Sequence, residues 1–331
     1  MPEQRPAVAT SSRVEAIDVA RGVALVAMAI YHFSWDLEFF GYTEPGTTAV
    51  GGWKFFARGI ASSFLFLVGV SLWMAHGRGI RWNGYWKRLA MVAGAAGAIS
   101  IATYIAVPDA FIFFGILHQI AVASVLGLAF LRLPWVGVLL VAVLVIVLPS
   151  LVRSSIFDPA WLAWIGFAQM PPRSNDFVPI FPWFGAVLLG IAAGKLATAS
   201  GLLARLAIWH PGRWSIPLQF AGRHSLGVYL IHQPVLIAAI YLASIVAPPA
   251  VEPPEVGFSS ACERQCQEVR DEAFCTRYCS CLLDRFDADG RLAAVLEGTA
   301  ELDSNYLEGA AAQCTGEAET AMPNRPGLDD D

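Results

Sequence analysis

Seven runs of about 20 mostly apolar residues occupy most of this chain, at about 15–35, 53–75, 87–106, 111–131, 134–152, 178–197 and 222–247. Lipid offers no hydrogen-bond partner to a backbone amide, so runs of this length cross a bilayer as helices. The composition agrees, with 56% hydrophobic and 15% charged residues. We predict an all-α polytopic membrane helix bundle with about seven transmembrane helices.

The basic residues predict how the bundle is oriented. With a cytoplasmic N-terminus, the inner side holds twelve of them: Arg5, Arg13, Arg21, Arg78, Arg81, Lys87, Arg88, Arg132, Lys195, Arg205, Arg213 and Arg223. The outer side holds four: Lys54, Arg58, Arg153 and Arg173. The positive-inside rule therefore predicts N-in and C-out. The N-terminus lacks the basic n-region of a cleaved signal, so we keep residues 15–35 as the first helix.

The last 80 residues differ from the membrane body. Residues 1–250 carry a net charge of +7 and residues 251–331 carry −12. The segment "APPAVEPPEVG", from Ala247 to Gly257, is proline-rich and predicts a stiff linker. We predict a membrane domain over 12–247, a linker over 248–257 and an acidic, Cys-rich extracytoplasmic domain over 258–331.

All six cysteines lie in that last domain: Cys262, Cys266, Cys275, Cys279, Cys281 and Cys314. An even number outside the cytoplasm favours disulfides. Two C-x3-C pairs would place their thiols one turn apart on two helices, which could be stapled twice, leaving Cys281 and Cys314 for a third bridge. This is one of 15 pairings. A zinc site is the alternative, but no histidine accompanies these cysteines, and we expect no metal.

The first apolar run carries four ionisable residues on one helical face. Asp18, Arg21, His32 and Asp36 fall within about 60° of arc at 100° per residue. A charge at membrane depth costs at least ~2.5–3.5 kcal/mol, so such a stripe is expected to face the bundle interior and to mark a site. The alternative is that Asp18 and Arg21 pair at the inner interface while Asp36 sits in outer water.

The stripe has two ends with different chemistry. Arg21, beside Asp18, could clamp an anion near the cytoplasm. His32 precedes Asp36 by one turn, an arrangement that suits proton transfer. Arg21 and His32 are separated by about 16 Å along the helix axis, which is similar to the reach of a pantetheine arm.

Several motifs resemble those of a known family. The pattern of Asp18, Arg21 and His32 resembles the first-helix signature of acyltransferase-3 enzymes. "HFSWDL", "FLFLVGVSL", "FGILHQIAVASVLG", "FVPIFPWFGAVLLGIAAGKL" and "AGRHSLGVYLIHQPV" together resemble a bacterial member of the heparan-α-glucosaminide N-acetyltransferase catalytic-domain family, over roughly residues 12–246. The resemblance implies a transmembrane acyltransferase of a bacterial inner (plasma) membrane. Such an enzyme takes an acyl group, with acetyl-CoA the expected donor, from cytoplasmic acyl-CoA and transfers it to a hydroxyl or amine of an extracytoplasmic carbohydrate or envelope acceptor.

The resemblance also implies roles for individual residues. Arg21 would hold the phosphates or the pantetheine end of CoA, oriented by Asp18. His32 would be the base or a transient acyl carrier, with Asp36 beside it. Lysosomal members place the histidine of the His-x-Ser-Trp motif in a longer loop after the first helix, whereas here His32 begins "HFSW" itself. Its role therefore stays open between base and nucleophile.

Other polar residues are candidates for a substrate chamber. His118, Gln119 and His232 lie in the fourth and seventh runs, where hydrogen-bonded core residues are the alternative. Lys54 and Arg58, at the outer end of the second run, could receive an anionic acceptor or polarise the acyl carbonyl; otherwise they snorkel to lipid phosphates.

The run "RGIRWNGYWKR", from Arg78 to Arg88, is a topology signal. It could also collect CoA phosphates, which makes Arg88 a candidate cofactor-binding residue.

Two other functions remain open. A transporter or flippase would suit helices broken at Pro182 and Pro234, although no inverted repeat is evident. A membrane anchor displaying the tail would leave the stripe unexplained. The expected partners are membrane lipid, acyl-CoA and a glycan or envelope acceptor, and no nucleic acid. A protein partner or lid role for the acidic tail and a homo-oligomer are further candidates.

Overall fold

The computed structural model describes residues 14–249, 253–296 and 304–320, which are helical apart from turns, loops and one isolated bridge between Phe114 and Phe177. These residues form two compact units. Of the described residues, unit 1 comprises 14–29 and 57–233, and unit 2 comprises 30–56 and the described residues from 234 onward. Three helices belong to both units: α1 (Glu15–Phe39), α2 (Gly51–His76) and α10 (Ser225–Val246).

The other helices belong to one unit each. Unit 1 contains α3 (Trp82–Ala106), α4 (Ile116–Gly127), α5 (Trp135–Leu151), α6 (Ala160–Ala163), α7 (Ile180–Ala199), α8 (Leu202–Ile208) and α9 (Ile216–Arg223). Unit 2 contains α11 (Pro254–Cys266), α12 (Glu272–Ala288), α13 (Leu292–Leu296) and α14 (Ser304–Thr320).

Five helices are long and apolar enough to cross a membrane: α1, α2, α3, α7 and α10. Two further predicted spans form shorter helices, with 17 residues in α5 and 12 in α4, which a 3-10 turn extends to Phe130. At 1.5 Å per residue, α5 is about 26 Å long, slightly less than a typical hydrocarbon core. The all-helical membrane class is confirmed, while seven spans and the N-in orientation remain predictions.

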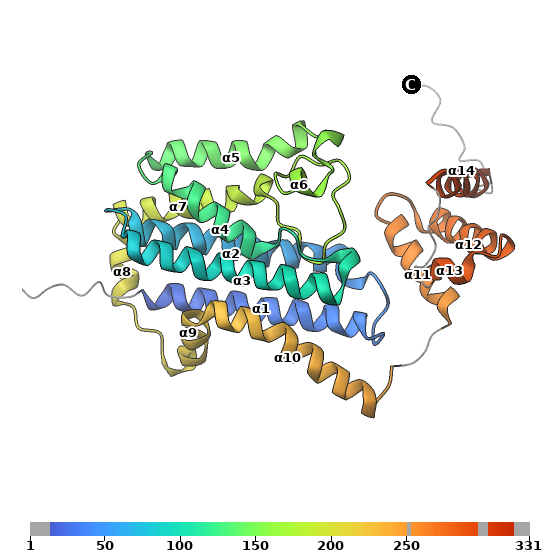
Figure 1. Cartoon of the computed structure of the whole chain (residues 1–331), viewed down its shortest axis with the longest axis horizontal. Coiled ribbons are helices and arrows are strands. Elements are labelled where there is room, and N and C mark those ends of the chain that lie inside the picture. Colours follow the sequence, from blue (N-terminus) through green and yellow to red (C-terminus); the bar gives the residue numbers. More distant parts are fainter. Residues whose placement is uncertain (1–13, 250–252, 297–303, 321–331) are drawn as a thin grey trace, which may run out of the picture. The chain divides into compact units, whose positions relative to one another are not determined.

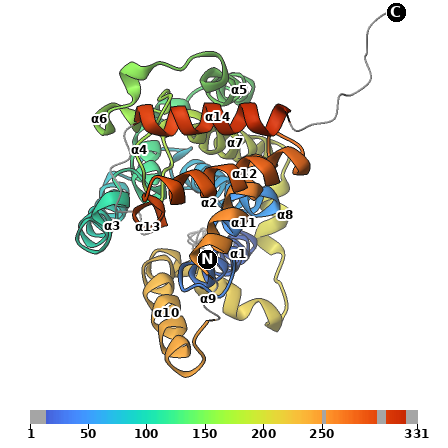
Figure 2. The same ribbon diagram turned by 90° about the vertical axis from the view of Figure 1, so that its right-hand side faces the viewer.

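The core of unit 1 lies where α2, α4, α5 and α7 meet. Leu65, Val138, Val187, Leu188 and Ile191 are fully buried there. Helix α5 packs along α7, and α3 packs against α4 (Figure 1). Figure 2 shows α3 and α5 end-on, so both run in a similar direction. Outward-facing side chains are apolar instead of charged, as at Ile105 and Leu140, which are 77% and 67% exposed. Such faces suit contact with lipid.

Both prolines at which the sequence predicted a broken helix lie within helices of the structure. The backbone is non-helical at Phe181, directly before Pro182, so α7 is kinked near its start. Pro234 lies inside α10.

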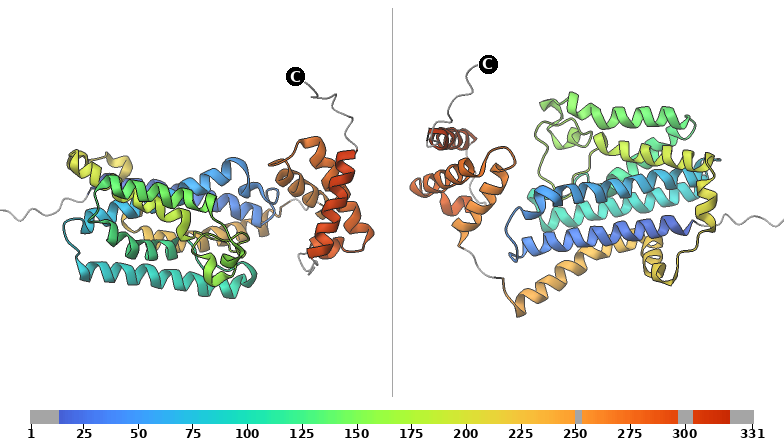
Figure 3. Two further views of the ribbon diagram at one scale, coloured as in Figure 1. Left: turned by 90° about the horizontal axis from the view of Figure 1, so that it is seen from above. Right: turned by 180° about the vertical axis from the view of Figure 1, so that it is seen from behind.

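The tail of unit 2 is held by three disulfides. Cys262 pairs with Cys279 and Cys266 with Cys275, which staples α11 to α12 twice, as the C-x3-C spacing predicted. Cys281 pairs with Cys314 and joins α12 to α14. These two helices lie side by side (Figure 3). All six cysteines are used, so the zinc alternative is wrong.

Within unit 2, the first tail helix contacts the loop between α1 and α2. Arg264 donates to the Glu44 carboxylate and to the Pro45 carbonyl. Lys54 and Glu268 form an ion pair at 3.5 Å. Helix α11 begins at Pro254, inside the predicted linker over 248–257, so the helical part of the tail starts earlier than expected.

Candidate functional site

Helix α1 buries its polar stripe and exposes the opposite face. The side chains of Asp18 and Asp36 are 2% and 0% exposed, and Arg21 and His32 are partly buried. On the other face, Val23 and Ile30 are 52% and 50% exposed. The four ionisable residues therefore face protein, as the helical wheel predicted, and not lipid.

In unit 1, the stripe begins with one carboxylate between two guanidinium groups. Arg21 Nη1 donates to Asp18 Oδ1 at 3.1 Å, and Arg223 Nε lies 3.5 Å from Asp18 Oδ2. Arg21 Nη2 also donates to Ser71 Oγ at 2.5 Å. We call Asp18, Arg21 and Ser71, together with Gln219 and Arg223 of α9, the Asp18 cluster.

Helix α9 comes close enough to α1 to complete the cluster because each helix has a glycine where the two meet. A Cβ on Gly222 would meet the Asp18 carbonyl oxygen at 1.9 Å, and one on Gly22 would meet the Leu218 carbonyl at 2.2 Å. Small residues let helices in membranes approach in this way. The approach delivers Arg223 and Gln219 to the cluster.

Gln219 connects the cluster into a network. Its Nε2 donates to Ser215 Oγ at 3.0 Å and to Glu15 Oε2 at 3.4 Å, and its Oε1 accepts from Arg223 Nη2 at 3.2 Å. Sequence reasoning missed Ser71, Gln219 and Arg223. For Arg223, the available signal was a basic residue at the inner end of a predicted span.

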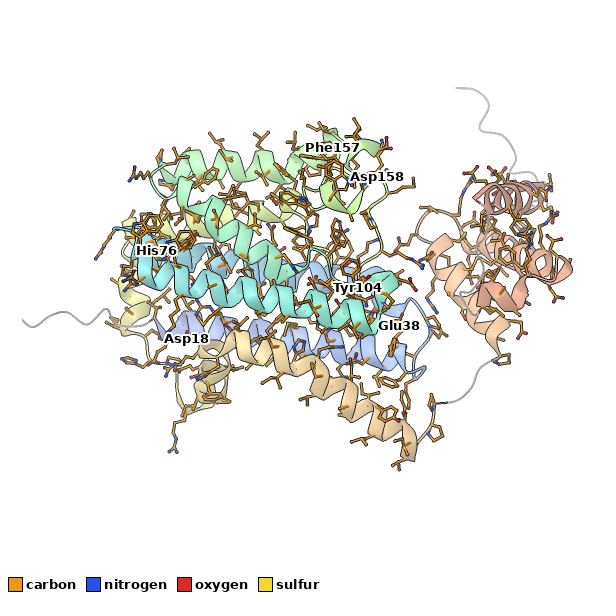
Figure 4. The ribbon with its side chains drawn as sticks, viewed as in Figure 1. Asp18, Glu38, His76, Tyr104, Phe157 and Asp158 are labelled. Carbon is orange, nitrogen blue, oxygen red and sulfur yellow. A yellow bond between two sulfur atoms is a disulfide. The ribbon has the colours of Figure 1, made fainter. Side chains whose placement is uncertain are left out.

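The Asp18 cluster is suited to bind an anion. Guanidinium groups bind phosphate and carboxylate through paired donors, and a buried carboxylate that fixes their position reduces the ordering needed on binding. Figure 4 shows Asp18 and His76 toward one end of unit 1, and Tyr104, Phe157 and Asp158 toward the other. The cluster therefore occupies one end of this helical unit.

In unit 2, the C-terminal part of α1 carries His32 and Asp36. The ring of His32 meets Tyr31 edge-on with 5.8 Å between centroids. Glu38, off the stripe, orders the following loop, since its carboxylate accepts from Gly46 N at 2.5 Å and from Thr48 N at 2.9 Å. The fully buried Asp36 lies one turn after His32.

The two α4 candidates have different environments. His118 Nδ1 accepts from Gly115 N at 3.2 Å, and Nε2 lies 3.2 Å from Ser100 Oγ, so both ring nitrogens have partners. Gln119 is fully buried, and neither amide atom has a hydrogen-bond partner among the residues that the structure describes. This makes Gln119 the stronger candidate for contact with a ligand.

The remaining predicted residues are dispersed. His232 Nδ1 lies 2.6 Å from the Tyr229 carbonyl oxygen on α10. Arg58 is exposed on α2, and Lys54 is paired with Glu268. Arg88 lines a hollow with α2 and α4 residues and has no contact with Asp18 or Arg21 among the described interactions. No group of three or more His, Cys, Asp or Glu that could hold a metal occurs in the described parts of the chain.

Asp176 is a polar residue that sequence reasoning missed. The segment before α7 pairs with the segment before α4, through Asn175 N to Ala110 O at 2.9 Å and Val178 N to Phe114 O at 3.0 Å. This places Asp176 Oδ2 2.8 Å from Ile116 N, at the start of α4. Burial raises the pKa of this carboxyl from 3.8 to about 6, against the opposing effect of that hydrogen bond. A carboxyl with such a pKa can exchange a proton near neutral pH.

Long apolar helices, apolar outward faces and a buried polar stripe on α1 define a polytopic membrane protein with an internal polar site. The model of the family "Heparan-alpha-glucosaminide N-acetyltransferase, catalytic" matches residues 13–234, more than half of the 331 residues, and the chain belongs to this family. Membership indicates a membrane transferase of the acetyltransferase type. No curated protein and no solved structure matched the chain.

Proposed function

We propose that this protein is an integral membrane acyltransferase that moves an acetyl group from cytoplasmic acetyl-CoA to a hydroxyl or amine of an extracytoplasmic carbohydrate or envelope acceptor. The observation that carries the proposal is the stripe on α1, where ionisable residues are buried along a helix long enough to span a bilayer. Family membership supports acetyl-CoA as the donor.

One end of the stripe would bind CoA, and the other end would carry out the acetyl transfer. Arg21 and Arg223, held by Asp18, would bind the phosphates of CoA near the inner surface. Helix α1 continues unbroken to His32, about 16 Å further along its axis, so a pantetheine arm lying along it would bring the thioester toward His32.

His32 would serve the transfer in one of two ways. As a base, it takes the proton of the acceptor O–H or N–H while the acceptor atom attacks the thioester carbonyl, the C–S bond breaks and CoA leaves as the thiolate. As a carrier, a ring nitrogen of His32 attacks the thioester carbonyl, the C–S bond breaks and CoA leaves as the thiolate; the acceptor atom then attacks the acyl-imidazole, the C–N bond breaks, and the released imidazole takes the acceptor's proton. In both cases Asp36, one turn away, would orient the imidazole.

The test uses the full chain in proteoliposomes with labelled acetyl-CoA and glucosamine as the acceptor probe. Release of CoA thiol and transfer of label are measured for wild type, His32→Ala and Ser34→Ala. Ser34 lies on the same helix away from the stripe, so its variant is the matched control. We expect His32→Ala to lose roughly 100-fold or more in turnover while it still binds CoA. Turnover equal in the two variants, or a wild type indifferent to acetyl-CoA, would refute the proposal.

The same samples distinguish the two roles of His32. Acid quenching during turnover, followed by mass spectrometry, detects an acetylated peptide containing His32 if the residue is a carrier. A base leaves that peptide unmodified at every time point.

A further inference from the structure

A small hollow of about 20 Å³ lies between α2, α3 and α4, separate from the Asp18 cluster. Four of its lining residues are apolar and four are polar; they are Val68, Leu72, Leu89 and Val92, and His76, Tyr85, Arg88 and Ser124. No carboxylate lines it. We call it the Tyr85 hollow. It lies at the end of unit 1 where Figure 4 places His76.

The hydroxyl of Tyr85 is the first sign that the hollow holds a ligand. Tyr85 is 4% exposed, and its hydroxyl has no hydrogen-bond partner in the described parts of the chain. A buried polar group without a partner costs roughly 1–3 kcal/mol, so proteins rarely retain one without a use. An acceptor inside the hollow would supply the missing partner.

Arg88 is the second sign. It is the seventh residue of α3, about 9 Å beyond the helix start, and within the described residues it has neither a hydrogen bond nor an ion pair. Arg88 is exposed, so it lies at the open side of the hollow and can meet an anion that approaches from outside.

His76 adds a third donor. Its Nδ1 accepts a hydrogen bond from Arg81 N at 3.3 Å, which assigns the ring proton to Nε2. Its ring meets that of Tyr85 edge-on, with 5.6 Å between centroids. Ser124 already donates to the Ile120 carbonyl at 2.6 Å. The hollow therefore combines several unused donors with no acid, which favours an anion.

We propose that the Tyr85 hollow is a phosphate site, with Arg88 as counter-ion and the Tyr85 hydroxyl as donor. The volume suits one or two oxygen atoms, so these oxygens of the phosphate would enter the hollow and the rest of the ligand would lie outside it. Next to the hollow, Trp82 and Trp86 are stacked at 6.2 Å and are 51% and 57% exposed, as is common at a membrane interface. The phosphate could belong to an anionic lipid headgroup or to CoA.

This site is distinct from the Asp18 cluster because the two use different faces of α2. Ser71 contacts Arg21, whereas Val68, Leu72 and His76 line the hollow. Consecutive residues such as Ser71 and Leu72 point about 100° apart on a helix. The inference does not rest on the proposed acyl transfer, and its test does not use activity.

The test compares wild type, Arg88→Gln, Tyr85→Phe and Lys87→Gln, each as the full chain purified in detergent. Lys87 is the matched control, since it is the basic neighbour of Arg88 on α3, is exposed like Arg88, and does not line the hollow. One arm titrates phosphatidylglycerol and measures the bound fraction by native mass spectrometry. The other measures the affinity for CoA and for CoA lacking its 3′-phosphate by calorimetry.

We expect Arg88→Gln to lower the affinity for one of these ligands by roughly tenfold or more. Tyr85→Phe should lower it by a few-fold, and Lys87→Gln by less than about twofold. Loss confined to phosphatidylglycerol identifies a lipid phosphate; loss of CoA affinity identifies a phosphate of CoA. Tyr85→Phe removes only an unpartnered hydroxyl, so it carries the test even if Arg88→Gln does not fold. If neither arm separates Arg88→Gln and Tyr85→Phe from Lys87→Gln, the proposal is wrong.

Discussion

The Asp18 cluster and the Tyr85 hollow contain similar chemical groups but differ in how far these groups are paired. Arg21 has Asp18 and Ser71, and the Gln219 amide has Ser215, Glu15 and Arg223. In the hollow, the Tyr85 hydroxyl and Arg88 have no such partners. The paired network fixes helices α1, α2 and α9 relative to one another within unit 1 and holds Arg21 and Arg223 in position before a ligand binds, whereas these two groups of the hollow have no such partner within the described chain.

Because of this difference in pairing, removing a polar side chain should have opposite effects on stability in the two places. Removing one member of a paired cluster leaves the others uncompensated, which is strongly destabilising. Removing an unpartnered polar group relieves a desolvation cost and stabilises the empty protein. Residues retained despite that cost are the ones for which a functional role is most reasonable.

The largest effect should come from the centre of the paired cluster. Asp18→Asn removes the buried carboxylate that Arg21 and Arg223 share, so we expect a loss on the order of 3 kcal/mol of unfolding free energy. Arg223 is partly exposed at 42%, which keeps the loss below that of a fully buried triad. Thermal unfolding in detergent measures it. Asp109→Asn, at an exposed carboxylate, is the control. Equal melting temperatures for the two variants would show that the Asp18 cluster does not stabilise the fold.

The carboxyl of Asp176, which lies outside both sets, should make the stability of the protein depend on pH. Its pKa is about 6 in the folded protein and 3.8 without burial, so the folded state binds the proton more tightly. Stability contributed by this group is complete below about pH 4 and falls as the pH rises to about 6, by about 3 kcal/mol in total. Asp176→Asn keeps an acceptor for Ile116 N and should lack this dependence. The measurement is the melting temperature of both proteins between pH 4 and 7. Parallel curves would contradict a raised pKa.

Two glutamines allow the same substitution to be tried on both sides of the comparison. Gln219→Leu breaks three hydrogen bonds and should cost about 1–3 kcal/mol. Gln119→Leu removes an amide with no partner in the described structure and should raise stability by up to about 1 kcal/mol while lowering acetyl transfer. Thermal unfolding and turnover are measured together. If Gln119→Leu destabilises the protein and leaves turnover intact, Gln119 is a structural residue.

The parts of this protein that follow simple periodicity could be predicted from the sequence. The burial of Asp18 and Asp36 on one face of α1 follows from the 100° rotation per residue, and the pairing of α11 with α12 follows from two C-x3-C spacings. Both depend on contacts between residues that are close along the chain, or on a geometry that one helix imposes.

The residues that were missed depend on tertiary contact. Arg223 reaches Asp18 only because Gly22 and Gly222 let α9 approach α1. Asp176 reaches the start of α4, where it is partly buried, only because two loops far apart in sequence pair with each other. Likewise, Arg88 was grouped with Arg21 because both are basic and near the inner side, whereas α2 separates their contacts. Charge and hydropathy along a chain do not report which helix faces meet.

The smallest effect is expected at an exposed ion pair in unit 2. Lys54 and Glu268 lie 3.5 Å apart with side chains 42% and 41% exposed, so water and salt screen their attraction. A double-mutant cycle with Lys54→Ala and Glu268→Ala should give a coupling of about 0.2–0.5 kcal/mol that declines with added salt. The same variants test Lys54 as a receptor for an anionic acceptor. In that role, Lys54→Ala would raise the KM for the acceptor, while Glu268→Ala, which frees the lysine, would lower it. Equal KM values in both variants would assign Lys54 to the surface pair alone.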